Sequence, residues 1–314
     1  MAILRRKIIL GAKVEATKGT AETLTNSEAI LVEDVSSPYT PEEVVRMTQR
    51  DTLSRSASIP GSPVATVDFR MEMKGGGAAT TPPAWSEVIK GCGFTETVNT
   101  SDVTWALDSD DGDTDTLTIG FYNDGVYHRL HGARGNVSFE MTANQVCYLV
   151  FSFTGIYTAR SNVAMLTTPS DTVVPPKFYN AALTYNFGSA WSTAVFSSLN
   201  IDMVNTVTIR ENANATNGLS YAVLTDRDPT ITTDLDRELN ATAWLPEDYL
   251  ETPTTGAMAW DVGSAAGNKI SFSIPAAQII SRGDGDRDGV STDELTLKAR
   301  ISSTGDDEIT ITQT

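Results

Sequence analysis

One order of strands and helix occurs twice along this chain, and this apparent repeat restricts the fold more than any other feature. The first copy begins with the alternating segment 64–72 and the second with 228–236. An Ala-Trp pair, a second tryptophan-containing strand, a Gly-Asn strand and a closing strand then follow in each copy. They are residues 84–85, 103–105, 135–141 and 147–153 in the first, and 243–244, 258–260, 267–274 and 294–301 in the second. The pattern predicts a duplicated, β-rich unit.

Length and charge are consistent with such a unit. The 314 residues suffice for two domains that each bury a core, and 40% of them are hydrophobic. Acidic residues outnumber basic ones by 40 to 23, which gives a net charge of -17 at pH 7. Because this charge repels phosphate backbones, we expect no ordinary nucleic-acid binding.

Nothing in the sequence indicates secretion or a membrane. Cys92 and Cys147 are too few for a disulfide framework. Residues 1–10 lack the long apolar stretch and the cleavage site of a signal peptide. No apolar run approaches the ~20 residues that a membrane span needs. We therefore expect a protein that folds in a cytoplasm and has no membrane partner.

The pattern of elements predicts a mainly β fold with minor α content. It consists of two tandem antiparallel β-sandwich or half-barrel domains, each with one flanking helix. An N-terminal arm and the first domain are expected over 1–160, a linker over 161–177 and the second domain over 178–314. Within the arm, a strand is expected at 30–35. Turn signals at 123–125 and 132–136 predict antiparallel hairpins.

Two elements of the first copy have the clearest patterns. Between 67 and 73, apolar residues alternate with charged ones, which predicts a strand with one apolar and one charged face. Pro82 and Pro83 open a helix that is expected to run through Lys90. Its apolar residues follow helical spacing and form one stripe for burial: Trp85, Val88, Ile89 and Cys92.

One acidic motif could bind a metal ion. Asp284, Asp286 and Asp288 stand at alternate positions before Gly289, as in the first half of a calcium loop. The acid expected at the twelfth position is missing, because Leu295 stands there. A solvated acidic hairpin explains the same residues, so calcium remains one of two interpretations.

No catalytic constellation is recognisable, and we expect no enzyme. His128 and His131 are the only histidines, and their spacing on a strand places them on opposite faces, which disfavours a shared metal. The five tryptophans allow two interpretations, a sugar-binding set or core packing. Core packing explains better why two pairs of them occupy matching places in the two copies.

Several motifs in order resemble the tail tube proteins of long-tailed, siphovirus-like bacteriophages. They are Pro60-Gly61-Ser62-Pro63, the strand at 67–73, Pro82-Pro83-Ala84-Trp85 with the helix to Cys92-Gly93, and residues 304–309. The resemblance implies a structural virion protein whose β-rich subunits stack as rings around a channel for double-stranded DNA. With a duplicated domain it implies threefold, pseudo-sixfold rings of homotrimers, with homohexamers as the alternative. The other implied partners are the tape-measure, tail terminator and distal tail proteins, and assembly takes place in the host cytoplasm.

The resemblance also implies two sets of site residues. Polar faces of the two matching strands are expected to line the channel: Asp68, Arg70, Glu72, Thr230, Thr232, Asp234 and Asp236. The irregular region near the N-terminus is expected to contact the next ring: Ser36, Tyr39, Glu42, Arg46, Arg50 and Arg55. An acidic lumen repels DNA and lets it slide.

Two other functions stay open at this point. A calcium-dependent extracellular adhesin or carbohydrate-binding module would use the motif at 284–289 and exposed tryptophans. A tail terminator would share the fold of the tube protein but stop at one ring. The duplication favours the tube.

Overall fold

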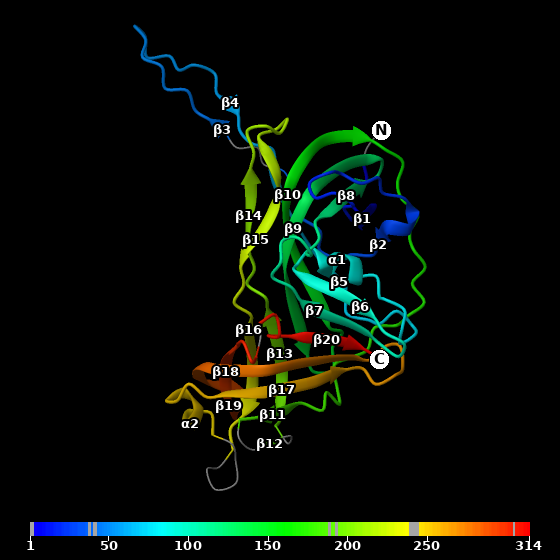
Figure 1. Ribbon diagram of the computed structural model, residues 1–314, viewed down its shortest axis with the longest axis vertical. Helices are drawn as coiled ribbons and strands as arrows, with labels where there is room; N and C mark the ends of the chain where they lie inside the picture. Colours follow the sequence, from blue (N-terminus) through cyan, green and yellow to red (C-terminus); the bar gives the residue numbers. More distant parts are fainter. Residues whose placement is uncertain are drawn as a thin grey trace.

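Antiparallel strands dominate the computed structural model, which describes residues 3–36, 39, 43–187, 190–191, 194–238, 245–303 and 305–314 (Figure 1). Residues 190 and 191 are described by their backbone alone. The α-helices of the described part are α1 (Ser86–Lys90) and α2 (Glu247–Leu250). Neither helix has the length and apolar character needed to span a bilayer. The prediction of a mainly β fold is confirmed.

The N-terminal half contributes a hairpin-rich part of the sheet. Its strands are β1 (Ile8–Val14), β2 (Ala29–Ile30), β3 (Glu43–Val44), β4 (Ile59–Pro60), β5 (Val64–Glu72), β6 (Phe94–Val98), β7 (Val103–Leu107), β8 (Leu117–Asn123), β9 (Val126–Thr142) and β10 (Tyr148–Asn162). Six of them lie side by side in the order β2-β1-β8-β9-β10-β5. Strand β6 pairs with β7, and β3 with β4.

The C-terminal half shows the same order of pairing. Its strands are β11 (Thr184–Asn186), β12 (Ala190–Trp191), β13 (Phe196–Asp202), β14 (Thr206–Glu211), β15 (Leu219–Asp226), β16 (Thr230–Asp236), β17 (Thr255–Val262), β18 (Ile270–Arg287), β19 (Val290–Ala299) and β20 (Thr310–Gln313). Here the order is β12-β11-β17-β18-β19-β16. Strands β14 and β15 form a separate hairpin.

The two halves are joined into one sheet and one core. Strand β13 pairs with β16 on one side and with β9 on the other, and β20 pairs with both β18 and β7. A single hydrophobic cluster includes residues of both halves. Phe139 of β9 packs edge-on against Phe272 of β18 with 5.4 Å between ring centroids, and the Trp260 Nε1–H points at the Met141 sulfur at 3.4 Å.

Local patterns predicted several elements correctly. Helix α1 ends at Lys90, and Trp85, Val88, Ile89 and Cys92 are all buried. Asp124 and Gly125, with φ of 46° and 95°, make the predicted turn between β8 and β9. Trp85, Trp105 and Trp260 are buried, as core packing predicts. The side chain of Trp191 and all of Trp244 lie outside the described part.

The turn predicted at 132–136 is wrong, because β9 runs straight through these residues. Gly132 adopts φ of 56°, and the register of β9 shifts here against both β8 and β10. The glycine therefore supports a β-bulge rather than a chain reversal. The bulge lies beside Arg134, which is buried and donates to Asp115 O and to the side chain of Asp111.

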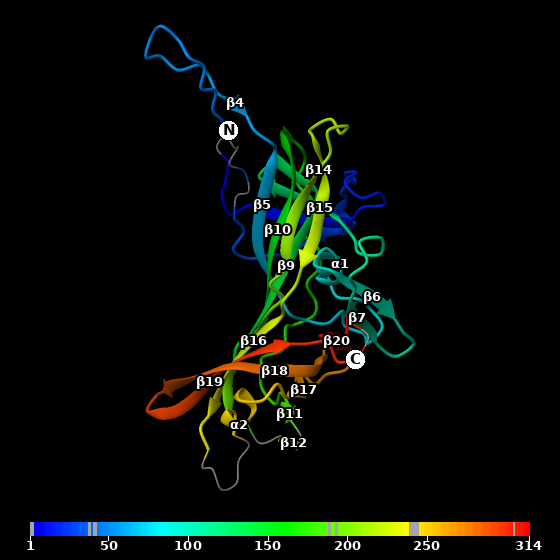
Figure 2. The same cartoon turned by 60° about the vertical axis from the view of Figure 1, so that its left-hand side comes forward.

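The N-terminal region is also less irregular than predicted. Strand β1 pairs with β8 along its whole length, and Leu10 at its centre is fully buried. Apolar residues at 8–10 thus form a core strand rather than part of an arm. The expected strand at 30–35 is reduced to β2 and a single bridge between Glu33 and Arg70. The hairpin of β3 and β4 projects far from the body (Figures 1 and 2).

Only part of the sequence match between the halves is reproduced in the sheet. Strands β5 and β16 hold equivalent places, because β5 pairs with β10 and β16 pairs with β19. Trp105 and Trp260 do not, since β7 lies between β6 and β20 whereas β17 lies between β11 and β18. In the order of pairing, β17 corresponds to β8.

Candidate assembly surface

The two strands predicted to line a channel each have one polar and one buried face. In β5, Val67 and Phe69 are buried, while Asp68 and Arg70 point to the opposite side. The same alternation places Glu72 on the polar side. In β16, Ile231, Thr233 and Leu235 are buried, and Thr230, Thr232, Asp234 and Asp236 lie on the polar side.

The registers between strands show that these two polar sides belong to one face of the sheet. From β5, Arg70 lies opposite Val150 of β10, which lies opposite Ser138 of β9. Ser138 in turn lies opposite Asp202 of β13, and Asp202 opposite Thr230 of β16. Residues directly opposite each other in a ladder point to the same side. Strand β13 therefore joins the two predicted patches into one polar face.

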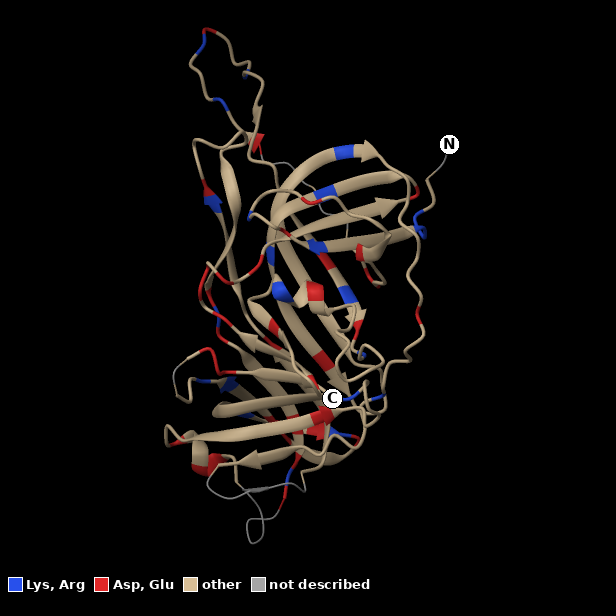
Figure 3. Cartoon of the chain, turned by 45° about the vertical axis from the view of Figure 1, so that its right-hand side comes forward, with Lys and Arg blue, Asp and Glu red and all other residues tan. Residues whose placement is uncertain are grey.

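Acidic residues outnumber basic ones on this polar face, and Figure 3 shows where charged residues occur along the strands. By the same registers, its charged residues that are not buried are the acids Asp68, Glu72, Glu140, Asp202, Asp234, Asp236 and Glu294 and the bases Arg70, Arg287 and Lys298. Arg134 lies on the same side of β9 but is buried. The other positions include Ser, Thr and Asn side chains, and the opposite face of the same strands packs into the core. The chain thus presents a broad, hydrophilic, net acidic wall.

The bases on the polar face are held by acids. Arg70 pairs with Glu33 at 2.9 Å and with Asp34 at 3.0 Å, and Arg287 pairs with Asp234 at 2.9 Å and with Asp236. Burial opposes the charge of Arg70, but the hydrogen bond to Glu33 and the nearby acids raise its pKa. The ion pairs of Arg70 and Arg287 lie at the two ends of the polar face. Neither arginine therefore lies at its centre.

Asp234 is the most strongly anchored acid of the face. It accepts hydrogen bonds from the backbone and hydroxyl groups of Ser197 and Ser198. Burial opposes the charge of this carboxylate, and the hydrogen bonds from Ser197 and Ser198 outweigh it, so the pKa of Asp234 is lowered. The acid therefore remains charged at neutral pH and fixes β13 against β16.

The residues predicted to contact a neighbouring ring fall in different places. Arg46, Arg50 and Arg55 lie exposed on the projecting segment between β3 and β4. Tyr39 instead stacks on Tyr157 with ring centroids 3.9 Å apart. Ser36 lies at the edge of the sheet, where its N–H donates to Asp68 O at 2.9 Å. Glu42 lies outside the described residues.

Exposed apolar side chains accompany the arginines of this segment. Met47 is 82% exposed and Leu53 is fully exposed, with a relative accessibility of 106%. Val44, Val45 and Ile59 at the base of the segment are also exposed. Sequence reasoning missed this apolar component, although the residues were visible in an otherwise polar stretch. Such a group of side chains on a projecting hairpin is typical of an interaction surface.

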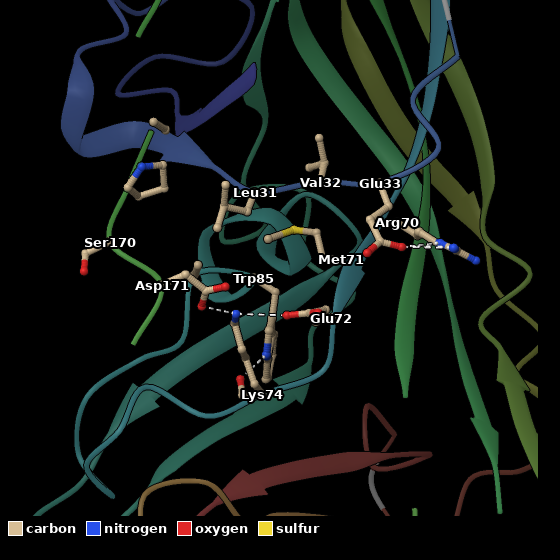
Figure 4. Close-up of a pocket in the computed structure, with 13 residues that line it drawn as sticks. Leu31, Val32, Glu33, Arg70, Met71, Glu72, Lys74, Trp85, Ser170 and Asp171 are labelled. Atoms are coloured by element: carbon tan, nitrogen blue, oxygen red, sulfur yellow. Dashed lines mark hydrogen bonds and ion pairs between the residues drawn. The ribbon is translucent and has the colours of Figure 1, made fainter. Parts of the chain in front are cut away.

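A pocket of about 280 Å³ lies between β5, α1 and the segment after β10 (Figure 4). Lys74 pairs there with Glu72 at 3.0 Å and with Asp171, and its backbone carbonyl accepts the Trp85 indole N–H at 2.9 Å. Burial opposes the charge of Lys74, but the hydrogen bonds to Asp171 and Glu72 raise its pKa. Since these ion pairs occupy the lysine, the pocket has the character of a structural junction.

The other candidate residues are engaged in local contacts. Asp284 pairs with Arg237 and Arg282, and Asp286 accepts the Gly289 N–H at 3.1 Å in the turn between β18 and β19. Asp288 has φ of 54° in that turn. Within the described part of the chain, no three His, Cys, Asp or Glu side chains are placed to hold a metal ion.

The histidines contribute to side-chain packing between strands. His128 Nδ1 lies 2.8 Å from the Tyr157 hydroxyl, and His131 Nδ1 lies 3.4 Å from the Thr158 hydroxyl. Tyr157 and Thr158 are neighbours on β10 and point to opposite faces, as the spacing of the histidines predicts. Burial lowers the pKa of both imidazoles.

These features describe a β-rich chain with a wide, net acidic face and a projecting hairpin that carries exposed apolar and basic side chains. The comparison with protein families gives the particular class. A family model described as phage tail tube protein matches residues 6–314, and the chain therefore belongs to the phage tail tube protein family. No curated protein matches the chain significantly. The family is structural and non-enzymatic, and it decides against the adhesin interpretation.

Proposed function

We propose that this tail protein assembles into stacked rings around a DNA channel, in a siphovirus-like tail, and that its sheet forms the wall of that channel. The observation that carries the proposal is the single polar face formed by β5, β10, β9, β13, β16 and β19, with the core behind it. A sheet that is hydrophilic on one side and packed on the other suits a wall between water and protein.

We further propose that the chain contains two tube units and forms threefold, pseudo-sixfold rings. The shared order β2-β1-β8-β9-β10-β5 and β12-β11-β17-β18-β19-β16 supports a duplication. Three such chains supply six units, whereas a ring of six chains would contain twelve. Closed rings leave no free sheet edge, which prevents uncontrolled strand addition.

The acids of the polar face support a lumen that releases DNA. Seven acids against three bases, with the bases already paired, give DNA few cations to bind. Binding by counterion release requires Lys or Arg that is free to contact phosphates. Asp68, Arg70, Glu72, Thr230, Thr232, Asp234 and Asp236 would face the channel.

The projecting segment would connect one ring to the next. Burial of Met47 and Leu53 against a neighbouring ring would remove apolar surface from water, and Arg46, Arg50 and Arg55 could pair with acids there. The ends of the tube would meet the tape-measure, terminator and distal tail proteins.

Negative-stain electron microscopy of the purified protein, with and without EDTA, tests the proposal. We expect stacked rings or tubes that are unaffected by EDTA. Particles that remain monomeric at high concentration would contradict tube formation. Tubes that dissociate with EDTA would show that the acidic hairpin around Asp286 binds a structural cation.

A further inference from the structure

Two edges of the polar sheet are open in the described chain. On one side, residues 33–36 run along β5, with the Glu33 N–H donating to Arg70 O and the Ser36 N–H donating to Asp68 O. On the other side, β17 pairs with β18 only up to Gln278, whereas β18 continues to Arg287. In the described part, no strand covers the outer edge of β18 beyond Gln278.

The molecule already contains one junction between its two halves at this wall. Residues 198–202 of β13 pair with 138–142 of β9. Additional backbone bonds extend the junction, since the Met203 N–H donates to Val137 O and the Ala143 N–H donates to Ser197 O. Asn205 closes its end by donating to the carbonyls of Cys92 and Gly135.

The equivalent strands locate the matching junction between chains. Segment 33–36 occupies the same place beside β5 that β13 occupies beside β16. Strand β9 has a bulge opposite β8 beside Ala133, and β18 has one opposite β17 beside Ala277. Strands β9 and β18 can be aligned at these two bulges. Strand β18 has one extra residue, Ile280, at its second bulge, opposite β19. With this residue allowed for, 138–142 of β9 correspond to 283–287 of β18.

We infer that residues 33–36 of one protomer add as an antiparallel strand to residues 284–287 of β18 in the next protomer, which closes the ring. This inference rests on the proposed tube function and specifies its lateral interface. Glu33, Asp34, Asp284 and Asp286 are exposed along the two edges, and α2 contacts β18 beside them through the ion pair between Glu247 and Arg282 at 3.2 Å. The contact is heterologous, so each protomer offers one edge of each kind and the assembly closes by rotation.

Charge favours one row of this register. Glu33 lies opposite Arg70 in the sheet. At the junction inside the chain, the residue of β9 in the corresponding row is Thr142. The residue of β18 that corresponds to Thr142 is Arg287. Glu33 of one protomer thus lies opposite Arg287 of the next, which is the favourable row, whereas the adjacent row brings Asp34 opposite Asp286. Opposite charges directly across an antiparallel pair are favourable, whereas like charges would oppose pairing.

A proline at position 284 tests the junction. In β9, the backbone groups of residues 137 and 143 point toward β13, and those of residue 139 do the same because alternate residues of a strand point the same way. Asp284 is the residue of β18 that corresponds to residue 139. The Asp284 N–H therefore faces the open edge, and Asp284→Pro removes this donor without removing a bond to β19. Asp284→Ala is the matched control, because it also loses the carboxylate but keeps the N–H.

We expect Asp284→Ala to form polymers and Asp284→Pro to remain unassembled, with at least a tenfold lower sedimenting fraction and an unchanged circular dichroism spectrum. Polymers in both variants would overturn the junction but not the tube. If the unmodified protein also fails to polymerise, the tube proposal itself fails, and the junction with it.

Hydrogen exchange of the unmodified protein gives a second test that does not depend on a variant. In assembled tubes, the amides of Asp284 and Asp286 should exchange at least tenfold more slowly than in the dissociated protein. Equal exchange in both forms would overturn the inference, even if other segments became protected.

Discussion

Replacing Glu15 by glutamine should destabilise the protein strongly, although the two side chains have nearly the same shape. Glu15 is 5% exposed and accepts four hydrogen bonds. Its Oε1 accepts from the Gly132 N–H at 2.7 Å and the Thr118 hydroxyl at 2.8 Å, and its Oε2 accepts from the Gly19 N–H and the Thr116 hydroxyl, both at 2.7 Å. This carboxylate connects the end of β1 to β8 and β9.

The magnitude follows from the number of acceptors that the substitution removes. A glutamine amide has one oxygen, and its NH₂ group would face a donor in place of the other. The threonine hydroxyls can rotate, but either the buried N–H of Gly132 or the half-buried N–H of Gly19 would lose its acceptor. A hydrogen bond to a charged group contributes about 1.5–3 kcal/mol, and a buried unsatisfied donor costs about 1–3 kcal/mol. We expect a loss of about 3 kcal/mol.

Equilibrium urea unfolding of the unassembled protein, followed by tryptophan fluorescence, measures this loss. Trp85 and Trp105 are buried 4.5 Å apart and will report the unfolding of this half. Glu87→Gln is the control, because Glu87 pairs with Lys90 on the surface of α1 and should contribute at most about 0.5 kcal/mol. A free energy of unfolding for Glu15→Gln within 0.5 kcal/mol of that of the control would refute the reasoning.

Three further predictions concern the junction, the lumen and a loop. Asn205→Ala should lower the free energy of unfolding by about 2 kcal/mol, because two carbonyls lose a donor; a loss below 0.5 kcal/mol in urea unfolding would contradict this. Thr232→Lys should slow DNA ejection from assembled virions, whereas Thr208→Lys on β14 should not; equal rates would contradict a lumenal Thr232. The hydrogen bonds from Ser302 lower the pKa of Asp307 to about 2. The contribution of this carboxylate to stability is therefore complete above pH 3.8 and is lost as the pH falls through about 2. A titration of the Asp307 carboxyl by NMR with a midpoint near 3.8 would contradict this prediction.

Sequence periodicity was sufficient to predict the polar faces of β5 and β16 separately. A period of two in 64–72 and 228–236 determines which residues share a side, whatever the rest of the fold does. It could not show that the two sides form one wall. That depends on β13, which pairs with β9 across about sixty residues of sequence, from Asn200 to Glu140.

Other features were missed because their partners are distant or their local signals are ambiguous. Glu15 follows a strand and resembles a loop acid, and its partners Thr116 and Gly132 come about a hundred residues later. Gly132 has the composition of a turn but serves a bulge, and only the register against β8 and β10 distinguishes the two.

The projecting hairpin illustrates a different limit. The irregular sequence predicted an arm for the whole N-terminal region, whereas only the hairpin of residues 43–60 projects from the body (Figure 1) and β1 packs into the core. The exposure of Met47 and Leu53 could not be inferred, because isolated apolar residues in a loop are as often buried beneath it as exposed.

Cryo-electron microscopy of the assembled protein tests the central claim most directly. We predict three protomers in each ring, with the polar faces of β5 and β16 of every protomer lining one continuous channel. A map in which Asp68 and Thr232 face the outside of the tube, or in which the core face of the sheet lines the channel, would contradict the account.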